Sequence, residues 1–276
     1  SGPRRIQLGA ARDSLIGVRF VSGRGEVVKS GGRVMKNVTG YDLVKFLSGS
    51  WGTLGVLSEV TFKVSPVPET EATVLLSGLD DGRAIAALSE ALGSPWSVTG
   101  AAHLPRSGRT LIRIDGFEDS VRTRAANLVD LLRPYGSASV MPAPESEAQW
   151  RSVRDLGVLM APPGSVVWRL SVRPSDGPQV VAAVRAAADA DVLYDWGGGL
   201  VWVVLRSGGD AGAALVRGAV AAVGGHATLF RAPDEVRLSV DVFQPLAAPI
   251  MALTRKLKAE FDPHAILNPG RMYPGI

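Results

Sequence analysis

Residues 31–66, GGRVMKNVTGYDLVKFLSGSWGTLGVLSEVTFKVSP, combine a short helical segment, a glycine-rich turn and a strand. Gly49, Gly52 and Gly55 carry no Cβ, so the backbone of the turn can approach a ligand closely and can adopt positive φ. Beyond the turn, four apolar residues alternate with mainly polar ones, at Val56, Val60, Phe62 and Val64. This period of two predicts a strand that is buried mainly on one side.

The segments that flank this turn carry their own local signals. Thr39 and Asp42 have the spacing of a capping box, which predicts a short helix that Thr39 caps and that stops at Gly49. Its apolar residues are Leu43, Val44, Phe46 and Leu47. Upstream, two apolar runs at residues 15–21 and 26–30 flank GRG, which predicts a β-hairpin.

Composition limits the class of protein. The 276 residues are 46% hydrophobic and 20% charged, which is typical of a globular chain with one large or two ordinary domains. No apolar run reaches the roughly 18 residues of a membrane-spanning helix, and the chain has no cysteine. The net charge of +4 comes from scattered cations, so we expect no nucleic-acid partner.

The middle of the chain alternates strand and helix patterns. Strands are predicted at residues 72–76, 110–115, 165–172, 200–205 and 227–231, and helices at 83–92, 121–132, 180–188 and 211–223. Two successive β-α-β-β-α-β passes predict an α+β domain with helices on one face of an antiparallel sheet. A last helix precedes the tail DPHAILNPGRMYPG.

The pairing of KNVTGYDL with GSWGTLG resembles the FAD-binding domain of the vanillyl-alcohol-oxidase (PCMH-type) flavoproteins. Within that superfamily the chain is most similar to the family of FAD-binding subunits of bacterial glycolate oxidases. The resemblance implies the second half of a PCMH-type FAD-binding domain at residues 1–68 and a ferredoxin-like α+β cap at 69–240. A C-terminal helix and tail, 241–276, would return to the FAD domain. The family's upstream phosphate-binding loop is not among these residues, so we expect an N-terminally truncated chain.

The resemblance also implies which residues contact FAD. In the turn they are Trp51, Gly52, Thr53, Leu54, Gly55, Val56 and Leu57, with Trp51 standing where many relatives have Glu. At the start of the chain they are Ser1, Gly2, Gly9 and Ala10, and in the tail Asn268. The alternatives are a glycine-rich turn without a ligand, a loop at a chain end and an ordinary turn-forming asparagine.

Catalytic residues are harder to assign. Residues 194–202, YDWGGGLVW, correspond to a segment that carries two metal-binding histidines in relatives acting on D-2-hydroxyacids, and neither histidine is present. The three histidines of the chain lie far apart in sequence, so we expect no metal site. Trp150 and Arg154 lie on a predicted helix at the place where relatives have a substrate-facing Trp-x-x-Arg pattern, although three residues separate them here. Arg154 is a candidate for binding a carboxylate, and a solvent-facing helix arginine is the alternative.

The resemblance thus implies an FAD-dependent oxidoreductase acting on the CH–OH group of 2-hydroxyacids, as a subunit of a glycolate oxidase or dehydrogenase complex. It would accept or relay electrons, with a homologous FAD-linked catalytic subunit and an iron–sulfur subunit as partners. The expected location is the cytoplasm, with a peripheral position at the inner membrane left open. Two alternatives are a non-catalytic assembly subunit and a single-chain FAD-linked D-lactate or alcohol oxidase. Substrate, electron acceptor, oligomeric state and unaided FAD binding are left open.

Overall fold

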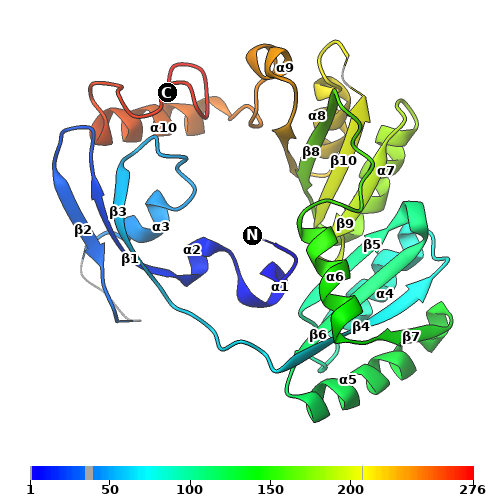
Figure 1. The fold of residues 1–276 in the computed structure, drawn as a ribbon. Helices are drawn as coiled ribbons and strands as arrows, with labels where there is room; N and C mark the ends of the chain where they lie inside the picture. Colours follow the sequence, from blue (N-terminus) through cyan, green and yellow to red (C-terminus); the bar gives the residue numbers. More distant parts are fainter. Residues whose placement is uncertain (1, 35–39, 207) are drawn as a thin grey trace. The chain divides into compact units, whose positions relative to one another are not determined.

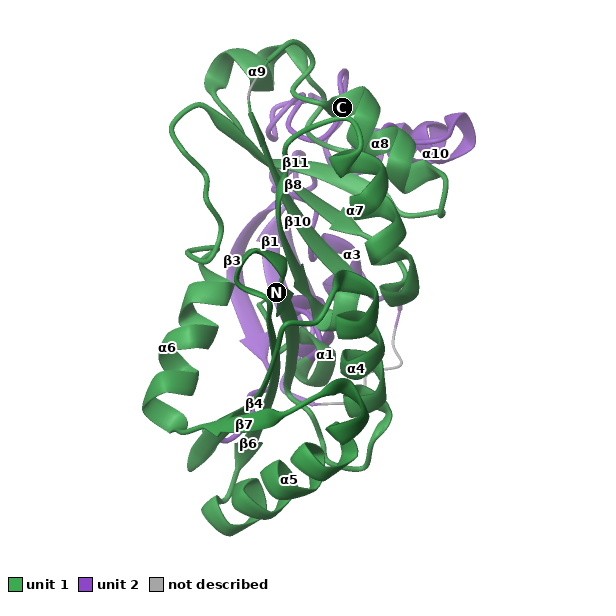
Figure 2. Cartoon of the chain, turned by 90° about the vertical axis from the view of Figure 1, so that its right-hand side faces the viewer, with its two compact units in different colours: residues 1–8, 67–244 green, residues 9–66, 245–276 purple. Residues whose placement is uncertain are grey.

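The structure is a computed structural model that describes residues 2–34, 40–206 and 208–276. The chain forms two compact units (Figure 2). Unit 1 comprises residues 1–8 and 67–244, and unit 2 comprises residues 9–66 and 245–276. The first eight residues therefore group with the segment expected to be the cap, and the tail groups with the glycine-rich turn. The functional assignment of these units as FAD domain and cap stays a prediction.

Unit 1 is built on one eight-stranded antiparallel sheet (Figure 1). Its strands are β4 (Thr70–Ser77), β5 (Gly100–Leu104), β6 (Arg109–Gly116), β7 (Ala138–Met141), β8 (Ser165–Ser171), β9 (Asp191–Asp195), β10 (Leu200–Arg206) and β11 (His226–Arg231). The order β11-β8-β10-β9-β5-β6-β4-β7 contains the ferredoxin-like order twice, and the two halves meet where His103 of β5 pairs with Tyr194 of β9. The predicted double β-α-β-β-α-β pass is confirmed.

Four helices cover one face of this sheet with apolar side chains: α4 (Asp81–Gly93), α5 (Glu118–Leu131), α7 (Gly177–Arg185) and α8 (Ala213–Ala221). The start of α4 is set by Asp80, whose carboxylate accepts the backbone N–H of Arg83 at 2.8 Å. The helix α6 (Ala143–Arg154) lies on the opposite side of the sheet from α4, α7 and α8 (Figure 2), and it buries Trp150 and Val153 there. The four predicted helices thus share one face, as expected, and α6 is an addition on the other face.

The strands that the sequence pattern missed are short, and two of the three are buried. β5 reads GAAHL and is buried at every position, so its sequence has no apolar–polar alternation. β9 is buried at four of its five residues, and β7 has only four residues. Unit 1 also contains α1 (Arg5–Leu8), α9 (Asp234–Ser239) and the 3-10 turns η1 (Pro105–Ser107), η2 (Arg133–Tyr135), η3 (Pro174–Asp176) and η4 (Trp196–Gly198).

Unit 2 contains a three-stranded antiparallel sheet in the order β2-β1-β3. Its elements are α2 (Ala11–Ser14), β1 (Leu15–Val21), β2 (Val27–Gly31), α3 (Leu43–Leu47), β3 (Val56–Phe62) and α10 (Ala248–Phe261). The predicted hairpin is β1–β2. The ring centre of Phe261 lies 5.3 Å from that of Phe46 and 6.2 Å from that of Phe20. The helix α10 therefore packs on the small core of the N-terminal segment.

Two expectations about unit 2 are corrected. Asp42 is itself the N-cap of α3 and accepts the backbone N–H of Lys45 at 3.1 Å, while Thr39 lies outside the described residues. β3 is not buried on one side, because both Val56 (58%) and Leu57 (46%) are exposed. Its register with β1 shifts between Leu57 and Glu59, which breaks the alternation. No helix in the described residues is long and apolar enough to cross a membrane.

Candidate functional site

The glycine-rich turn connects α3 to β3 and has an unusual backbone. Trp51 and Gly52 both have positive φ, 56° and 74°. A Cβ on Gly52 would stand 2.7 Å from Nδ2 of Asn268, so glycine is required there both by conformation and by space. The structure therefore places the predicted turn residue Gly52 directly beside the predicted tail residue Asn268.

Three of the predicted contact residues stabilise the turn itself. The hydroxyl of buried Thr53 donates to the carbonyl oxygen of Ser50 at 2.7 Å, and Leu54 belongs to the small core. A Cβ on Gly55 would stand 2.6 Å from Cδ2 of Phe20, so this glycine is needed for close packing. The assignment of these three residues as FAD contacts rests on the resemblance alone.

A buried ion pair holds the tail against the turn, and the sequence analysis missed it. Nζ of Lys258 donates to Asp262 Oδ2 at 2.6 Å, to the carbonyl oxygen of Thr53 at 2.8 Å and to that of Leu267 at 2.6 Å. Burial by itself raises the pKa of Asp262. Hydrogen bonds from Lys258 and from two backbone N–H groups outweigh this effect, so the net pKa of Asp262 is below its usual value. The i, i+4 spacing of a lysine and an aspartate at the end of an apolar helix was the available signal.

Asn268 completes this arrangement. Its Nδ2 donates to the carbonyl oxygen of Trp51 at 3.1 Å and approaches that of Gly52 at 3.4 Å. The backbone of Asn268 has φ of 43°, a left-handed conformation that asparagine tolerates better than most residues. Its side-chain amide therefore bridges the tail and the turn.

A pocket of about 460 Å³ opens beside the turn in unit 2. Its lining is Ala11, Leu15, Leu47, Ser48, Gly49, Ser50, Trp51, Gly52, Gly55, Val56, Leu57, Val60, Phe62 and Asn268. None of these side chains is charged, and Asn268 is the one amide among them. The amide N–H of Gly52 has no acceptor among the described residues. An apolar wall with a few backbone and amide groups fits a flat aromatic ring better than it fits a pyrophosphate.

The predicted residues at the start of the chain are divided between the units. Gly2 belongs to unit 1, where its carbonyl oxygen accepts Nε1–H of Trp196 at 3.1 Å. Gly9 and Ala10 belong to unit 2, where the backbone N–H of Ala10 donates to Asp13 at 2.7 Å. Ser1 lies outside the described residues.

Arg154 ends α6, as the sequence pattern predicts, and its guanidinium forms two parallel hydrogen bonds of 2.8 Å to Asp155. These bonds raise the pKa of Arg154 and lower that of Asp155. Arg154 also lines a second pocket of about 460 Å³ in unit 1, together with Gly2, Pro3, Arg4, Glu71, Arg113, Glu147, Trp150 and Arg151. A ligand carboxylate at Arg154 would therefore compete with Asp155.

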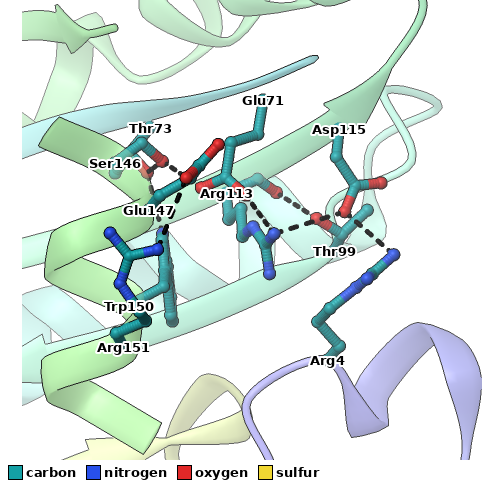
Figure 3. Close-up of polar contacts among 10 residues, drawn as sticks. All are labelled: Arg4, Glu71, Thr73, Thr99, Arg113, Asp115, Ser146, Glu147, Trp150 and Arg151. Atoms are coloured by element: carbon teal, nitrogen blue, oxygen red, sulfur yellow. Dashed lines mark hydrogen bonds and ion pairs between the residues drawn. The ribbon is translucent and has the colours of Figure 1, made fainter. Parts of the chain in front are cut away.

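The floor of this second pocket is a network of buried charges (Figure 3). Glu71 and Asp115 face each other across β4 and β6, and Arg113 on β6 forms ion pairs with both. Arg4 adds a further ion pair to Asp115 at 3.2 Å, and Ser146 donates to Glu71 at 2.6 Å. The carboxylates are thus matched by cations, which is what burial of charge requires.

The segment 194–202 has a different chemistry from the histidine motif that it matches. Asp195 is buried, and burial raises its pKa to about 7 although it accepts the N–H of Trp196. His103 is buried in β5, where Nδ1 pairs with Thr110 Oγ1 at 2.9 Å and Nε2 lies 3.4 Å from Asp81. Across the described ranges, no group of His, Asp or Glu side chains could hold a metal ion.

Comparison with known proteins gives two long matches. The chain is 32% identical to "Glycolate oxidase subunit GlcE" of Escherichia coli (strain K12) over 274 residues, covering 99% of this chain and 69% of that protein. It is 26% identical to "Glycolate oxidase subunit GlcD" of Bacillus subtilis (strain 168), covering 99% of this chain and 66% of that protein. No family model matches the chain.

Among solved structures, an alkyldihydroxyacetonephosphate synthase matches with a TM-score of 0.65 at 18% identity. The match covers 98% of this chain and 56% of that one. At this level of identity the likeness concerns the fold, and it is the same fold that the glycine-rich turn predicts.

Proposed function

The chain belongs to the family of the glycolate oxidase subunit GlcE, a family of FAD-linked oxidoreductases, and we propose that it is the FAD-binding subunit of a 2-hydroxyacid-oxidising complex. The observation that carries the proposal is the uncharged pocket of unit 2, bordered by the glycine-rich turn and Asn268. The two elements that the resemblance assigns to FAD, far apart in sequence, form the wall of one cavity.

The chain's own residues would act on the cofactor by shape and by hydrogen bonding. Leu57, Val60 and Phe62 of β3 offer an apolar surface to a flat ring, which explains why this strand is exposed in the described structure. The amide N–H of Gly52 and the side-chain amide of Asn268 offer polar contacts at its edge. When bound, FAD accepts a hydride equivalent from the carbon that carries the substrate's hydroxyl group.

The proposed partners follow from the two long matches. Both relatives are named as subunits of a glycolate oxidase, and this chain is similar to each over almost its whole length. A homologous FAD-linked subunit is therefore the expected neighbour in a complex, and an iron–sulfur subunit would take the electrons onward. Such a complex would work in the cytoplasm or at the inner face of the membrane.

A direct test is a titration with FAD, read by flavin absorbance after desalting. Val60→Glu places a carboxylate on the apolar wall of the pocket, and we expect FAD to bind at least about tenfold more weakly. The matched control is Val27→Glu, because Val27 is an exposed valine of β2 in the same sheet and does not line the pocket. Equal affinities in the two variants would contradict the assignment of the site.

The catalytic part of the proposal needs a second measurement in the assembled complex. Glycolate added without oxygen should bleach the flavin bands of this subunit. Bound FAD that no 2-hydroxyacid bleaches would favour a subunit that only relays electrons. A subunit that remains colourless in the complex would favour the assembly role, with the exposed apolar strand β3 as an interface.

A further inference from the structure

Arg169 occupies an unusual position on the sheet of unit 1. It lies in the middle of β8, directly opposite Trp202 of β10 and Thr228 of β11, and it is partly buried. Its guanidinium stacks over two indoles, 5.2 Å from the ring centre of Trp196 and 6.0 Å from that of Trp202. Within the described residues it makes no hydrogen bond and no ion pair.

The neighbours of Arg169 supply no negative charge. Its nearest neighbours on the same face of the sheet come from β8 itself and from the adjoining strands β10 and β11. They are Val167, Ser171, Leu200, Trp202, Val204, His226 and Thr228. None of these is a carboxylate. Phe230 closes the far side of Trp202, edge to face at 4.9 Å.

A second cation lies on the same indole. The guanidinium of Arg5 stands 4.7 Å from the ring centre of Trp196, so two arginines share one tryptophan. Burial and the charge of Arg5 lower the pKa of Arg169, and burial and the charge of Arg169 lower that of His226. Two guanidiniums and an imidazole therefore lie close together in this part of unit 1.

Elsewhere in unit 1 a second partly buried arginine that stacks on a tryptophan has backbone acceptors for one of its nitrogens. Arg217 also stacks on a tryptophan, 5.4 Å from the ring centre of Trp168, but it donates to the carbonyl oxygens of Asp241 and Phe243. Cation–π contact at Arg169 supplies on the order of 0.5–2 kcal/mol and leaves its five N–H donors without a protein acceptor in the described part of the chain. A partly desolvated guanidinium without acceptors is costly unless a ligand supplies them.

The backbone under the site is also strained. Trp196 has φ of 54°, a left-handed value that a bulky aromatic residue rarely adopts, and its Nε1–H is held by the carbonyl oxygen of Gly2. Strain of this kind persists where the surroundings enforce it, and it gathers at ligand sites. The indole that both guanidiniums contact is thereby fixed in place.

We propose that Arg169, with Arg5 and the indoles of Trp196 and Trp202, binds a small organic carboxylate. A planar guanidinium pairs with a carboxylate through two parallel N–H···O bonds, and the flat faces of the two indoles beside Arg169 suit this planar pair. The identification of the ligand as the 2-hydroxyacid or its 2-oxoacid product rests on the proposed function. The carboxylate site itself does not depend on FAD.

Because Trp196 and Trp202 lie against the guanidinium, their fluorescence reports binding in the flavin-free chain. Glycolate and glyoxylate should each change the emission with a saturable curve, and the tighter of the two identifies substrate or product as the ligand. Glycolamide, the neutral isostere of glycolate, should give no saturable change. Inorganic phosphate that binds more tightly than both carboxylates would overturn the carboxylate assignment.

Arg169→Met should weaken carboxylate binding at least tenfold, while Arg217→Met, which removes the other stacked arginine, should leave it unchanged. Arg169→Lys keeps the charge but loses the fork, so it should bind more weakly than the wild type and more tightly than Arg169→Met. It also serves as the test if circular dichroism shows that Arg169→Met does not fold. If a folded Arg169 variant, Arg169→Met or Arg169→Lys, binds the carboxylate as tightly as the wild type does, the inference is overturned.

The flavin titration separates this inference from the proposed function. Carboxylate binding that depends on Arg169 in a chain that never takes up FAD would leave the carboxylate site standing and remove the flavin assignment. If the chain binds FAD but substitution of Arg169 does not change carboxylate affinity, the flavin assignment would stand and the carboxylate site would be removed.

Discussion

Replacement of Asp195 by asparagine should stabilise unit 1 at neutral and alkaline pH but not in acid. Asp195 ends β9, is 3% exposed, and has no cationic partner among the described residues. Burial raises the pKa of this carboxyl group from an ordinary value of 3.8 to about 7. Among the residues that the structure describes, one contact favours its ionised form, the backbone N–H of Trp196 at 2.8 Å.

The sign and size of the effect follow from proton linkage. Between about pH 4 and pH 7 the folded chain keeps a proton on Asp195 that the unfolded chain has lost, so the free energy of unfolding falls as the pH rises. A shift from 3.8 to about 7, at about 1.4 kcal/mol for each unit, corresponds to a loss of about 4 kcal/mol, complete above pH 7. Asparagine cannot ionise and still accepts the N–H of Trp196, so Asp195→Asn should avoid this loss.

Urea unfolding at constant ionic strength, followed by tryptophan fluorescence between pH 4.5 and pH 8.5, measures the difference. The free energy of unfolding of Asp195→Asn should exceed that of the wild type by about 4 kcal/mol at pH 8.5, and the difference should fall to about 1 kcal/mol at pH 4.5. The control is Asp119→Asn, whose carboxylate is 87% exposed and should matter by less than about 0.5 kcal/mol at any pH. Parallel pH profiles of the wild type and Asp195→Asn would refute the reasoning, because they would mean that Asp195 ionises normally in the folded chain.

Two further substitutions test the buried ion pairs. Arg113→Met should lower the free energy of unfolding by about 3–5 kcal/mol in urea, because it leaves Glu71 and Asp115 buried without their shared cation. Loss of no more than about 1 kcal/mol, the size expected for an exposed pair, would contradict that account. Lys258→Met should destabilise unit 2 by a similar amount and make the tail beyond α10 more sensitive to limited proteolysis, since Lys258 joins Thr53, Asp262 and Leu267. An unchanged cleavage rate would show that the tail is held by Asn268 and the aromatic contacts instead.

The local sequence predicted those parts of the fold that depend on neighbours along the chain. The hairpin β1–β2, the helix α3, the glycine-rich turn and the long helices of unit 1 carry signals within a window of about a dozen residues. Their amphipathic patterns and turn residues are sufficient because the periodicity of side chains belongs to each element. The double β-α-β-β-α-β order followed from the succession of these elements.

The strands β5 and β9 and the polar sites depend on contacts between distant residues. β5 has no pattern of its own and exists because β6 and β9 lie beside it. Lys258 reads as a solvent-facing helix residue until the carbonyl oxygens of Thr53 and Leu267 surround it. Arg169 reads as an ordinary strand residue until the pairing of β8 with β10 and the turn at Trp196 enclose it with indoles. Sequence by itself determined most of the helices and strands and the glycine-rich turn. Which charges are buried, and beside which partners, was decided only by the tertiary structure, because the free energy of a charge depends on all the groups that exclude water from it.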